Sequence, residues 1–254
     1  WLERDAEARR SLDSVLPYAR AALCVAREVP PGGPGTVARF ARGEDYHEAV
    51  RRDLKAVVAD LRRAAPRGAH FRVCVDTAPV LEREWAARAG LGFVGKNGML
   101  IVPGVGSHVV LGEVLTDLAL APTAPAVAAT WERCGGCSAC LDDCPTQAIV
   151  APRVVDARRC LSYLTIEKRS PFTAEEESWL GGRLFGCDDC QDVCPWNAGP
   201  RWSDAAGAMW DSDIGVGSGV CSGQKGRRAR IYSTSRDAGE SRCGWRPAGK
   251  IFEF

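Results

Sequence analysis

The chain has 254 residues, and its 33 Lys and Arg nearly balance its 32 Asp and Glu, giving a formal net charge of +1. This length allows a buried core and about two domains, while the balanced charge gives no overall signal for a nucleic-acid or membrane partner. No apolar run reaches the length of a membrane span, and no signal-peptide hydrophobic region is present. We therefore expect a cytoplasmic protein without a membrane partner. Because the sequence begins at Trp1, we also expect that an N-terminal segment is missing from it.

Residues 1–126 are expected to alternate between helices and strands. Apolar residues at helical spacing predict helices over residues 2–20 and 44–64. Pro79 stands at a first-turn position and predicts a further helix that continues to Arg88. The predicted strands are short and apolar or alternating, at residues 21–25, 70–75, 91–94, 99–102 and 108–115, with a turn over 95–98. This order predicts an α/β domain over residues 1–126.

Seven of the 12 cysteines lie in two runs that each end in Cys-Pro, and an eighth stands between these runs. The first run has the spacing C-x2-C-x2-C-x3-C-P and contains Cys134, Cys137, Cys140 and Cys144. The second contains Cys187, Cys190 and Cys194, and Cys160 stands alone upstream of it. Eight thiolates are the ligand count of two [4Fe–4S] clusters. The spacing therefore predicts a ferredoxin-like domain with two clusters over residues 127–200, after a proline-containing linker.

The fourth cysteine of such a run ligates the other cluster in two-cluster ferredoxins. We therefore expect a crossed assignment of the ligands. One cluster is predicted to bind Cys134, Cys137, Cys140 and Cys194, and the other to bind Cys144, Cys160, Cys187 and Cys190. Zinc is the alternative, because C-x2-C pairs also form tetrahedral zinc sites, although structural zinc usually uses two separated pairs. A disulfide framework is typical of short secreted chains and is not expected here.

Residues 201–254 differ in composition from the rest of the chain. They contain no leucine, few aliphatic residues, and glycines without a regular period. One interpretation is a disordered C-terminal tail. The other is that the reading frame is altered near residue 200, which the abrupt change in composition favours. Neither interpretation places a functional residue in this segment.

Three motifs add to the cysteine runs: D-T-A-P from Asp76, G-K-N from Gly95, and C-L-S-Y-L-T-I-E from Cys160. With these motifs, residues 10–200 resemble the epoxyqueuosine reductases, which are cobalamin-dependent iron–sulfur enzymes of tRNA modification. The cysteine runs alone fit any two-cluster ferredoxin, whereas the combination is far more specific. Family members continue past the cluster domain into helical repeats that help to hold tRNA, and residues 201–254 do not resemble these repeats.

The resemblance implies an α+β fold, in which an N-terminal α/β domain with a nitroreductase-like sheet binds cobalamin and a ferredoxin-like domain follows. The implied reaction reduces epoxyqueuosine to queuosine at the wobble position of tRNA and removes the epoxide oxygen as water. Electrons would pass from an unidentified low-potential donor through the two clusters to cobalt. The implied partners are that donor and a tRNA carrying epoxyqueuosine, and we expect a monomer.

Asp76 is the predicted catalytic residue. Opening an epoxide leaves an alkoxide, and an acid within hydrogen-bond reach lowers the barrier. Asp76 stands where a predicted strand ends and a helix begins, a frequent location of site residues in α/β sheets. It matches the proposed proton donor of the family, and the resemblance also places it beside the cofactor. The alternative is an aspartate that caps the helix expected to begin near Pro79.

The resemblance also implies that Lys96, Asn97, Ser162 and Tyr163 contact cobalamin. For Lys96 and Asn97 the alternative is an ordinary turn with a solvated lysine. Ser162 and Tyr163 directly follow the cluster cysteine Cys160, and for them the alternative is simple helix packing.

His47 and the four remaining cysteines are not expected to bind a metal. Asp45-Tyr46-His47 is similar to the start of the cobalt-ligating loop of cobalamin mutases, but Val50 replaces its glycine and the stretch is helical. We expect no bond between His47 and cobalt, although Tyr46 and His47 could border the substrate pocket. The other cysteines lack partners at ligand spacing: Cys24, Cys74, Cys221 and Cys243. Of these, Cys24 and Cys74 lie in apolar strands and are expected to be core residues.

Two other classes of function remain open. A reductive dehalogenase has a related cobalamin and two-cluster architecture and acts on small organohalides. A pure electron carrier would use the first 126 residues only to dock a partner. Bound cobalamin separates the enzymes from the carrier, and the substrate separates the two enzymes.

Overall fold

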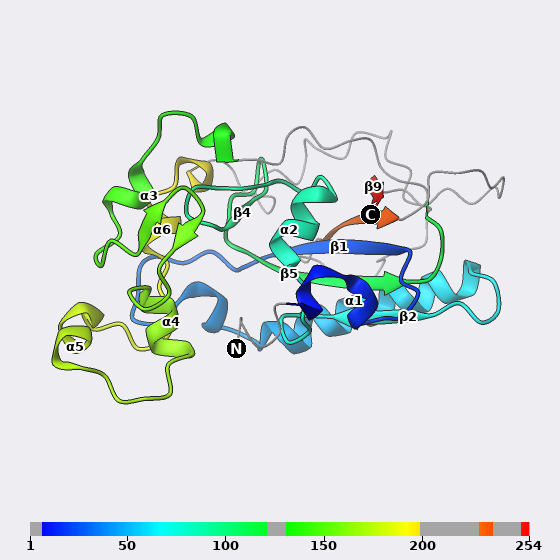
Figure 1. The fold of residues 1–254 in the computed structure, drawn as a ribbon, viewed down its shortest axis with the longest axis horizontal. Helices are drawn as coiled ribbons and strands as arrows, with labels where there is room; N and C mark the ends of the chain where they lie inside the picture. Colours follow the sequence, from blue (N-terminus) through cyan, green and yellow to red (C-terminus); the bar gives the residue numbers. More distant parts are fainter. Residues whose placement is uncertain (1–6, 121–130, 199–228, 236–249, 254) are drawn as a thin grey trace.

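The computed structural model describes residues 7–120, 131–198, 229–235 and 250–253. A five-stranded sheet forms its centre, and the short helices of the cysteine region lie at one end of the molecule (Figure 1). The strand order is β2-β5-β1-β8-β9. The strands are β1 (Ala21–Glu28), β2 (Phe71–Cys74), β5 (Val109–Thr116), β8 (Ala229–Ser235) and β9 (Lys250–Glu253). β5 is antiparallel to both β1 and β2, and β8 is antiparallel to β1 and parallel to β9.

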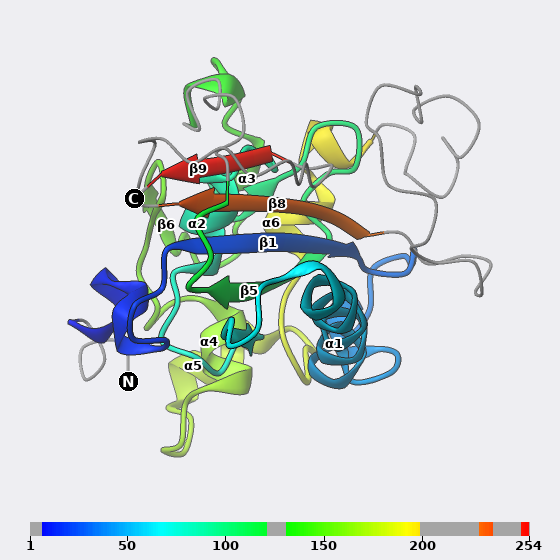
Figure 2. The same cartoon turned by 90° about the vertical axis from the view of Figure 1, so that its right-hand side faces the viewer.

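Helices cover both faces of this sheet (Figure 2). α1 (Tyr46–Ala64) carries Val50, Leu54 and Val58 on one side, spaced four residues apart. These residues pack on one face of β1 and β5. α2 (Glu82–Arg88) packs Trp85 and its neighbouring alanines on the opposite face. The amphipathic pattern of α1 is therefore sufficient to fix which side of the helix meets the sheet.

The cysteine region consists of short elements. Its helices are α3 (Ala139–Asp142), α4 (Leu161–Ile166), α5 (Ala174–Leu180) and α6 (Asp189–Asp192).

Outside the central sheet, two small hairpin sheets pair β3 (Phe93–Val94) with β4 (Leu100–Ile101), and β6 (Ile149–Ala151) with β7 (Val154–Val155). Single turns of 3-10 helix occur at Ala8–Arg10, Leu12–Ser14, Arg39–Ala41, Trp131–Cys134 and Pro195–Asn197.

Most of the predicted elements between residues 21 and 116 are confirmed, and three are wrong in part. The helix expected over residues 2–20 consists, within residues 7–20, of two 3-10 turns. The backbone is extended at Ser11 and left-handed at Tyr18, where φ is 68°, and Pro17 cannot donate a helical hydrogen bond. α2 begins at Glu82 rather than at Pro79. β3 and β4 form their own sheet instead of joining the central one.

Both predicted domain boundaries, near residues 126 and 200, lie outside the part of the chain that the structure describes. The proline-containing linker and the division at residues 126 and 127 lie within 121–130, so the two-domain division stays a prediction. Cys221 and Cys243 also lie outside the described part. Within the predicted tail, residues 229–235 and 250–253 form strands β8 and β9. These strands differ from the expectation of a tail that is disordered throughout. An altered reading frame stays a prediction.

Candidate cluster and substrate site

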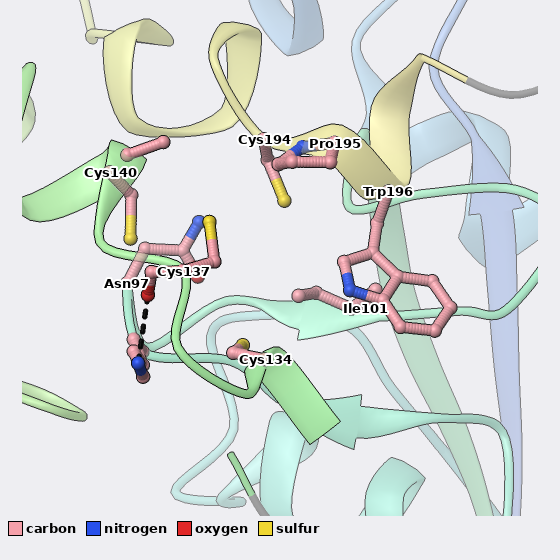
Figure 3. A pocket seen from close by; sticks show the side chains of 10 residues that line it. Asn97, Ile101, Cys134, Cys137, Cys140, Cys194, Pro195 and Trp196 are labelled. Atoms are coloured by element: carbon pink, nitrogen blue, oxygen red, sulfur yellow. Dashed lines mark hydrogen bonds between the residues drawn. The ribbon is translucent and has the colours of Figure 1, made fainter. Parts of the chain in front are cut away.

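Four cysteines from both runs line one cavity of about 140 Å³. Figure 3 shows the sulfur atoms of Cys134, Cys137, Cys140 and Cys194 gathered around a common space, with Trp196 and Ile101 nearby. Cys134 ends the 3-10 turn that begins at Trp131, Cys137 lies in the loop that follows, and Cys140 lies in α3. Cys194 directly precedes the 3-10 turn Pro195–Asn197. The cysteines therefore surround a space rather than one point. Consistently, the described residues contain no group of three or more Cys, His, Asp and Glu placed to hold a single metal ion.

The pKa values of Cys140 and Cys194 are raised, in part because the other cysteines of the cavity lie close to them. The pKa of Cys140 is raised to about 11, mainly by burial and in part by the nearby Cys194, Cys134 and Cys137. Burial also raises the pKa of Cys194, with added contributions from Cys134 and Cys137. Crowded thiols resist ionisation unless a cationic centre binds them, because metal ligands must be deprotonated. This donor set therefore fits an iron–sulfur cluster.

The remaining cluster cysteines lie close to one another in a second group: Cys144, Cys160, Cys187 and Cys190. Burial raises the pKa of Cys190 well above its usual value, and Cys187, Cys160, Cys140 and Cys144 add to the increase in that order. Burial raises the pKa of Cys187 to about 11, and Cys160 contributes again. The structure thus brings Cys144 and Cys160 near the pair from the second run, although Cys140 is also within electrostatic reach. The exact ligand sets stay predictions.

Asp76 lies at the end of β2 next to the first turn of α1. Its backbone is in the left-handed region, with φ at 54°, and its side chain is 56% exposed. The Oδ2 atom of Asp76 lies 3.3 Å from Nε2 of His47. The Nδ1 atom of His47 lies 2.8 Å from Oδ1 of Asp45, and the same oxygen accepts the His47 backbone N–H at 2.9 Å. His47 therefore bridges the capping carboxylate of α1 and the predicted catalytic carboxylate.

This arrangement favours a protonated imidazole. Burial lowers the pKa of His47, but the hydrogen bonds to Asp45 and Asp76 and their negative charges raise it by more, so the net shift is upward. The same hydrogen bonds lower the pKa of Asp45. The raised pKa favours a proton on His47, whose Nε2 lies 3.3 Å from Oδ2 of Asp76. Sequence reasoning placed His47 near the pocket but did not predict this contact.

Asp76 does not cap α2. The residue before α2 is Leu81, and no side-chain hydrogen bond caps this helix. Instead, Oε1 of Glu82 accepts the backbone N–H of Asp76 at 2.6 Å. Burial raises the pKa of Glu82 to about 7, the hydrogen bond from Asp76 opposes the rise, and the charge of Asp76 adds to it. Glu82 therefore anchors the loop that carries Asp76.

A second buried carboxyl lies behind this loop. Glu113 stands in the middle of β5, paired in register with Cys24 of β1 and Cys74 of β2, and it is fully buried. Neither of its carboxyl oxygens has a hydrogen-bond partner among the described residues. Burial raises its pKa well above the usual value, and the charge of Glu82 raises it further. An acidic residue within an otherwise apolar strand was the sequence signal that could have identified it.

The G-K-N turn is bound to both cysteine runs. Nζ of Lys96 donates to the carbonyl oxygens of Gly135 at 2.7 Å and of Cys137 at 2.8 Å. Nδ2 of Asn97 donates to the carbonyl oxygen of Cys190 at 3.1 Å, and Asn97 is buried. Both residues line the cavity of the four cysteines. The alternative of a solvated lysine is therefore wrong, while contact of these residues with cobalamin stays a prediction.

A second connection joins the segment before β5 to the end of the cysteine region. Asn197 accepts the backbone N–H of the buried Ser107 at 2.7 Å and donates to Ser107 Oγ at 3.0 Å and to the carbonyl oxygen of Gln191 at 2.6 Å. Gly106 allows this approach, because a Cβ there would lie 1.9 Å from Oδ1 of Asn197, and its φ is 102°. Sequence reasoning did not predict this connection.

Ser162 and Tyr163 lie half-buried in the first turn of α4, directly after Cys160. Neither lines the cavity of the four cysteines. Glu167 follows the last residue of α4 and lies close enough to Tyr46 to affect its pKa. Burial raises the pKa of Tyr46, and the charges of Asp76, Glu82, Asp45 and Glu167 add to the rise. α4 therefore ends near the carboxylates around Asp76, and cofactor contact by Ser162 and Tyr163 stays a prediction.

Two protein-family profiles match the chain. Residues 9–77 match "Epoxyqueuosine reductase QueG, DUF1730", and residues 133–197 match "4Fe-4S double cluster binding domain". An epoxyqueuosine reductase from Synechocystis is 43% identical over 198 residues, which cover 74% of this chain and 66% of that protein. The chain belongs to the epoxyqueuosine reductase family. An epoxyqueuosine reductase from Alicycliphilus denitrificans is 49% identical over 161 residues, covering 63% of this chain and 43% of the relative.

Solved structures of epoxyqueuosine reductases have the same fold. One in complex with an epoxyqueuosine-modified tRNA-Tyr stem loop superposes with a TM-score of 0.67 and 35% identity, covering 78% of this chain and 54% of that chain. Another, from Bacillus subtilis, has a TM-score of 0.64 and 32% identity over 78% of this chain and 54% of that chain, and is described with its aspartate-bearing catalytic loop swung out of the active site. The chain spans about half the length of several of these relatives.

Membership of the epoxyqueuosine reductase family confirms some of the predictions made from the sequence. The α+β fold with a double [4Fe–4S] region is confirmed, and the zinc and disulfide alternatives for the cysteine runs are set aside. Among the described residues, every helix is too short or too polar to cross a lipid bilayer. Cys24 and Cys74 are buried core residues, as predicted.

Proposed function

We propose that this chain reduces epoxyqueuosine in tRNA to queuosine, with two [4Fe–4S] clusters and a cobalamin as cofactors. The observation that supports this most is that the family match extends over both the sheet domain with its Asp76 loop and the complete set of cluster cysteines. The tRNA substrate is carried over from relatives, one of which is described with an epoxyqueuosine-modified tRNA stem loop.

The cofactors define what the chain itself must do. When bound, the clusters supply single electrons and the cobalamin supplies an electron-rich cobalt to the substrate carbon. Deoxygenation of an epoxide to an alkene and water consumes two electrons and two protons. The two predicted cysteine sets would hold the clusters, and the protein residues near the substrate would hold and donate protons.

Asp76 is the proposed proton donor to the oxygen released from the epoxide carbon. Its carboxyl is 56% exposed, so the described residues leave it open to face a substrate beside a cofactor. This exposure and the polar groups around it fit a cobalamin on the open side of the Asp76 loop. Both ring nitrogens of His47 are directed at carboxylates, which suits a proton holder better than a cobalt ligand.

His47 is proposed to return a proton to Asp76. Its Nε2 lies 3.3 Å from the Asp76 carboxyl, within reach of a direct proton transfer. The proton would move from Nε2 to Oδ2 after Asp76 has protonated the alkoxide. Glu82 keeps the loop in place through the backbone N–H of Asp76. The chain therefore offers a positioned acid with a second titratable group directly behind it.

An anaerobic assay tests the proposal. The reconstituted chain is incubated with excess low-potential reductant and an epoxyqueuosine-containing tRNA stem loop, and the nucleosides are measured by mass spectrometry. The expected product is queuosine, which lacks one oxygen of the substrate. A parallel reaction contains a small organohalide. Dehalogenation without queuosine formation would replace the proposal with a reductive dehalogenase, and neither product from a fully loaded protein would refute both enzymes.

A further inference from the structure

Lys96 places a positive charge in the cysteine cavity. The residue is half-buried and lines the cavity together with Cys134, Cys137, Cys140 and Cys194. Its Nζ is held by the carbonyl oxygens of Gly135 and Cys137, at 2.7 and 2.8 Å. The ring of Trp131 lies beneath it, with Nζ 5.6 Å from the ring centroid. These contacts fix the ammonium group within the segment that carries the first three cysteines.

Within the described part of the chain, no carboxylate forms an ion pair with Lys96. Several acidic side chains of the cysteine region have basic partners: Asp192 pairs with Arg39, Asp189 with Arg183, and Asp188 lies 3.9 Å from Arg42. Lys96 has no such ion pair among the described residues, and its hydrogen bonds go to neutral backbone carbonyls. Its full charge therefore acts on the cavity.

A fixed cation changes how readily a cluster accepts an electron. A [4Fe–4S] cluster with four thiolates becomes more negative by one charge on reduction, and its potential depends on nearby charge and hydrogen bonds. A positive charge close by stabilises the reduced form more than the oxidised form, and this effect decreases with distance. Burial strengthens it, because less water screens the charge.

We propose that Lys96 raises the reduction potential of the cluster bound by Cys134, Cys137, Cys140 and Cys194. Lys96 is then a residue that acts through the cluster rather than on the substrate. This inference rests on the proposed cluster ligands, but not on tRNA as the substrate. The neighbouring Asn97 already ties the turn to the carbonyl oxygen of Cys190, so the turn does not depend on Lys96 alone for its position.

Redox titration monitored by electron paramagnetic resonance tests the proposal on the anaerobically reconstituted chain. Lys96→Gln keeps a hydrogen-bond donor and removes the charge, whereas Lys96→Arg keeps the charge. Lys55→Met is the matched control, because it removes a lysine charge from an exposed position on α1. Iron content is measured for every variant before titration. The stem loop is absent, so the result does not depend on turnover.

Lys96→Gln is expected to disfavour the reduced form of one cluster about tenfold, which equals a shift of about 59 mV to lower potential for one electron. The other cluster should shift less, and Lys96→Arg and Lys55→Met should stay close to the wild type. Unchanged potentials in Lys96→Gln would overturn the proposal, as would an equal shift in Lys96→Arg. Loss of iron in Lys96→Gln would also overturn it, because Lys96 would then act by holding the cysteine loop. A potential shift in a chain that does not reduce epoxyqueuosine would leave this inference standing and refute the proposed function alone.

Discussion

Replacing Glu82 with Gln should make the stability of the fold less dependent on pH. Glu82 accepts the backbone N–H of Asp76 at 2.6 Å, and a Gln side chain offers the same acceptor without a charge. Burial raises the pKa of Glu82 from 4.5 to about 7. The folded chain therefore holds this proton to a higher pH than the unfolded chain does. Ionisation of Glu82 must then destabilise the folded state.

The pKa shift sets the size of the effect. The contribution of Glu82 to stability is fully present below pH 4.5 and is lost as the pH rises to about 7. One pKa unit corresponds to about 1.4 kcal/mol, so the loss is about 3 kcal/mol at most, and residual contact with water makes it smaller. Glu82→Gln should match the wild type near pH 4.5 and exceed its free energy of unfolding by about 1–3 kcal/mol at pH 8.

Urea denaturation followed by tryptophan fluorescence at several pH values and constant ionic strength measures this difference. The matched control is Glu84→Gln, which removes a carboxylate from the same helix at a 38% exposed side chain paired with Arg88 and Arg153. The control should change stability by less than about 1 kcal/mol. A Glu82→Gln variant that is less stable than the wild type at pH 8, or equally shifted at all pH values, would refute the reasoning.

Three further substitutions test the site. Asp76→Asn should retain iron and cobalamin but slow turnover by ~100-fold or more, because the general acid is lost; unchanged queuosine formation would remove Asp76 from the mechanism. Cys194→Ala should disturb the cluster that is built on Cys134, as seen by Mössbauer or paramagnetic resonance spectra, and loss confined to the cluster of Cys187 and Cys190 would show that the crossed assignment is wrong. Asn197→Ala should lower the free energy of unfolding by about 1–3 kcal/mol in urea denaturation, because it leaves the buried N–H of Ser107 unpaired; an unchanged midpoint would mean that water replaces it.

Local pattern was sufficient to predict the elements that bury a regular face. α1 follows directly from apolar residues at helical spacing and from Asp45, which caps its first turn. β1 and β5 are apolar segments of eight residues that lie in the middle of the sheet. The cysteine spacing likewise predicted an iron–sulfur region, because ligand spacing is a local property.

Local pattern failed where the backbone leaves regular geometry. Asp76 adopts a left-handed conformation, which sequence does not announce for a non-glycine residue. The chain then forms tight turns, with hydrogen bonds from Thr77 to Val75 and from Val80 to Ala78. These turns delay α2 and free the Asp76 side chain from capping. Within this segment, the helical pattern of the sequence therefore predicted the loop that carries Asp76 least well.

Contacts between distant segments were also beyond prediction. Lys96 and the carbonyl oxygen of Gly135 are 39 residues apart, and Asn197 and Ser107 are 90 apart. Their side chains are polar and would read as solvated in any local window. The structure shows instead that they connect segments near the central sheet to the cysteine runs. Such residues become recognisable only when the fold brings their partners together.

Everything proposed for the site depends on the chain holding both an electron supply and a cobalamin. Quantification of iron and cobalt, together with the visible spectrum of the anaerobically reconstituted chain, measures this directly. We predict about eight iron atoms and about one cobalt per chain, with corrin absorption beside the iron–sulfur bands. Full iron content with no bound cobalt would contradict the proposal and leave an electron carrier.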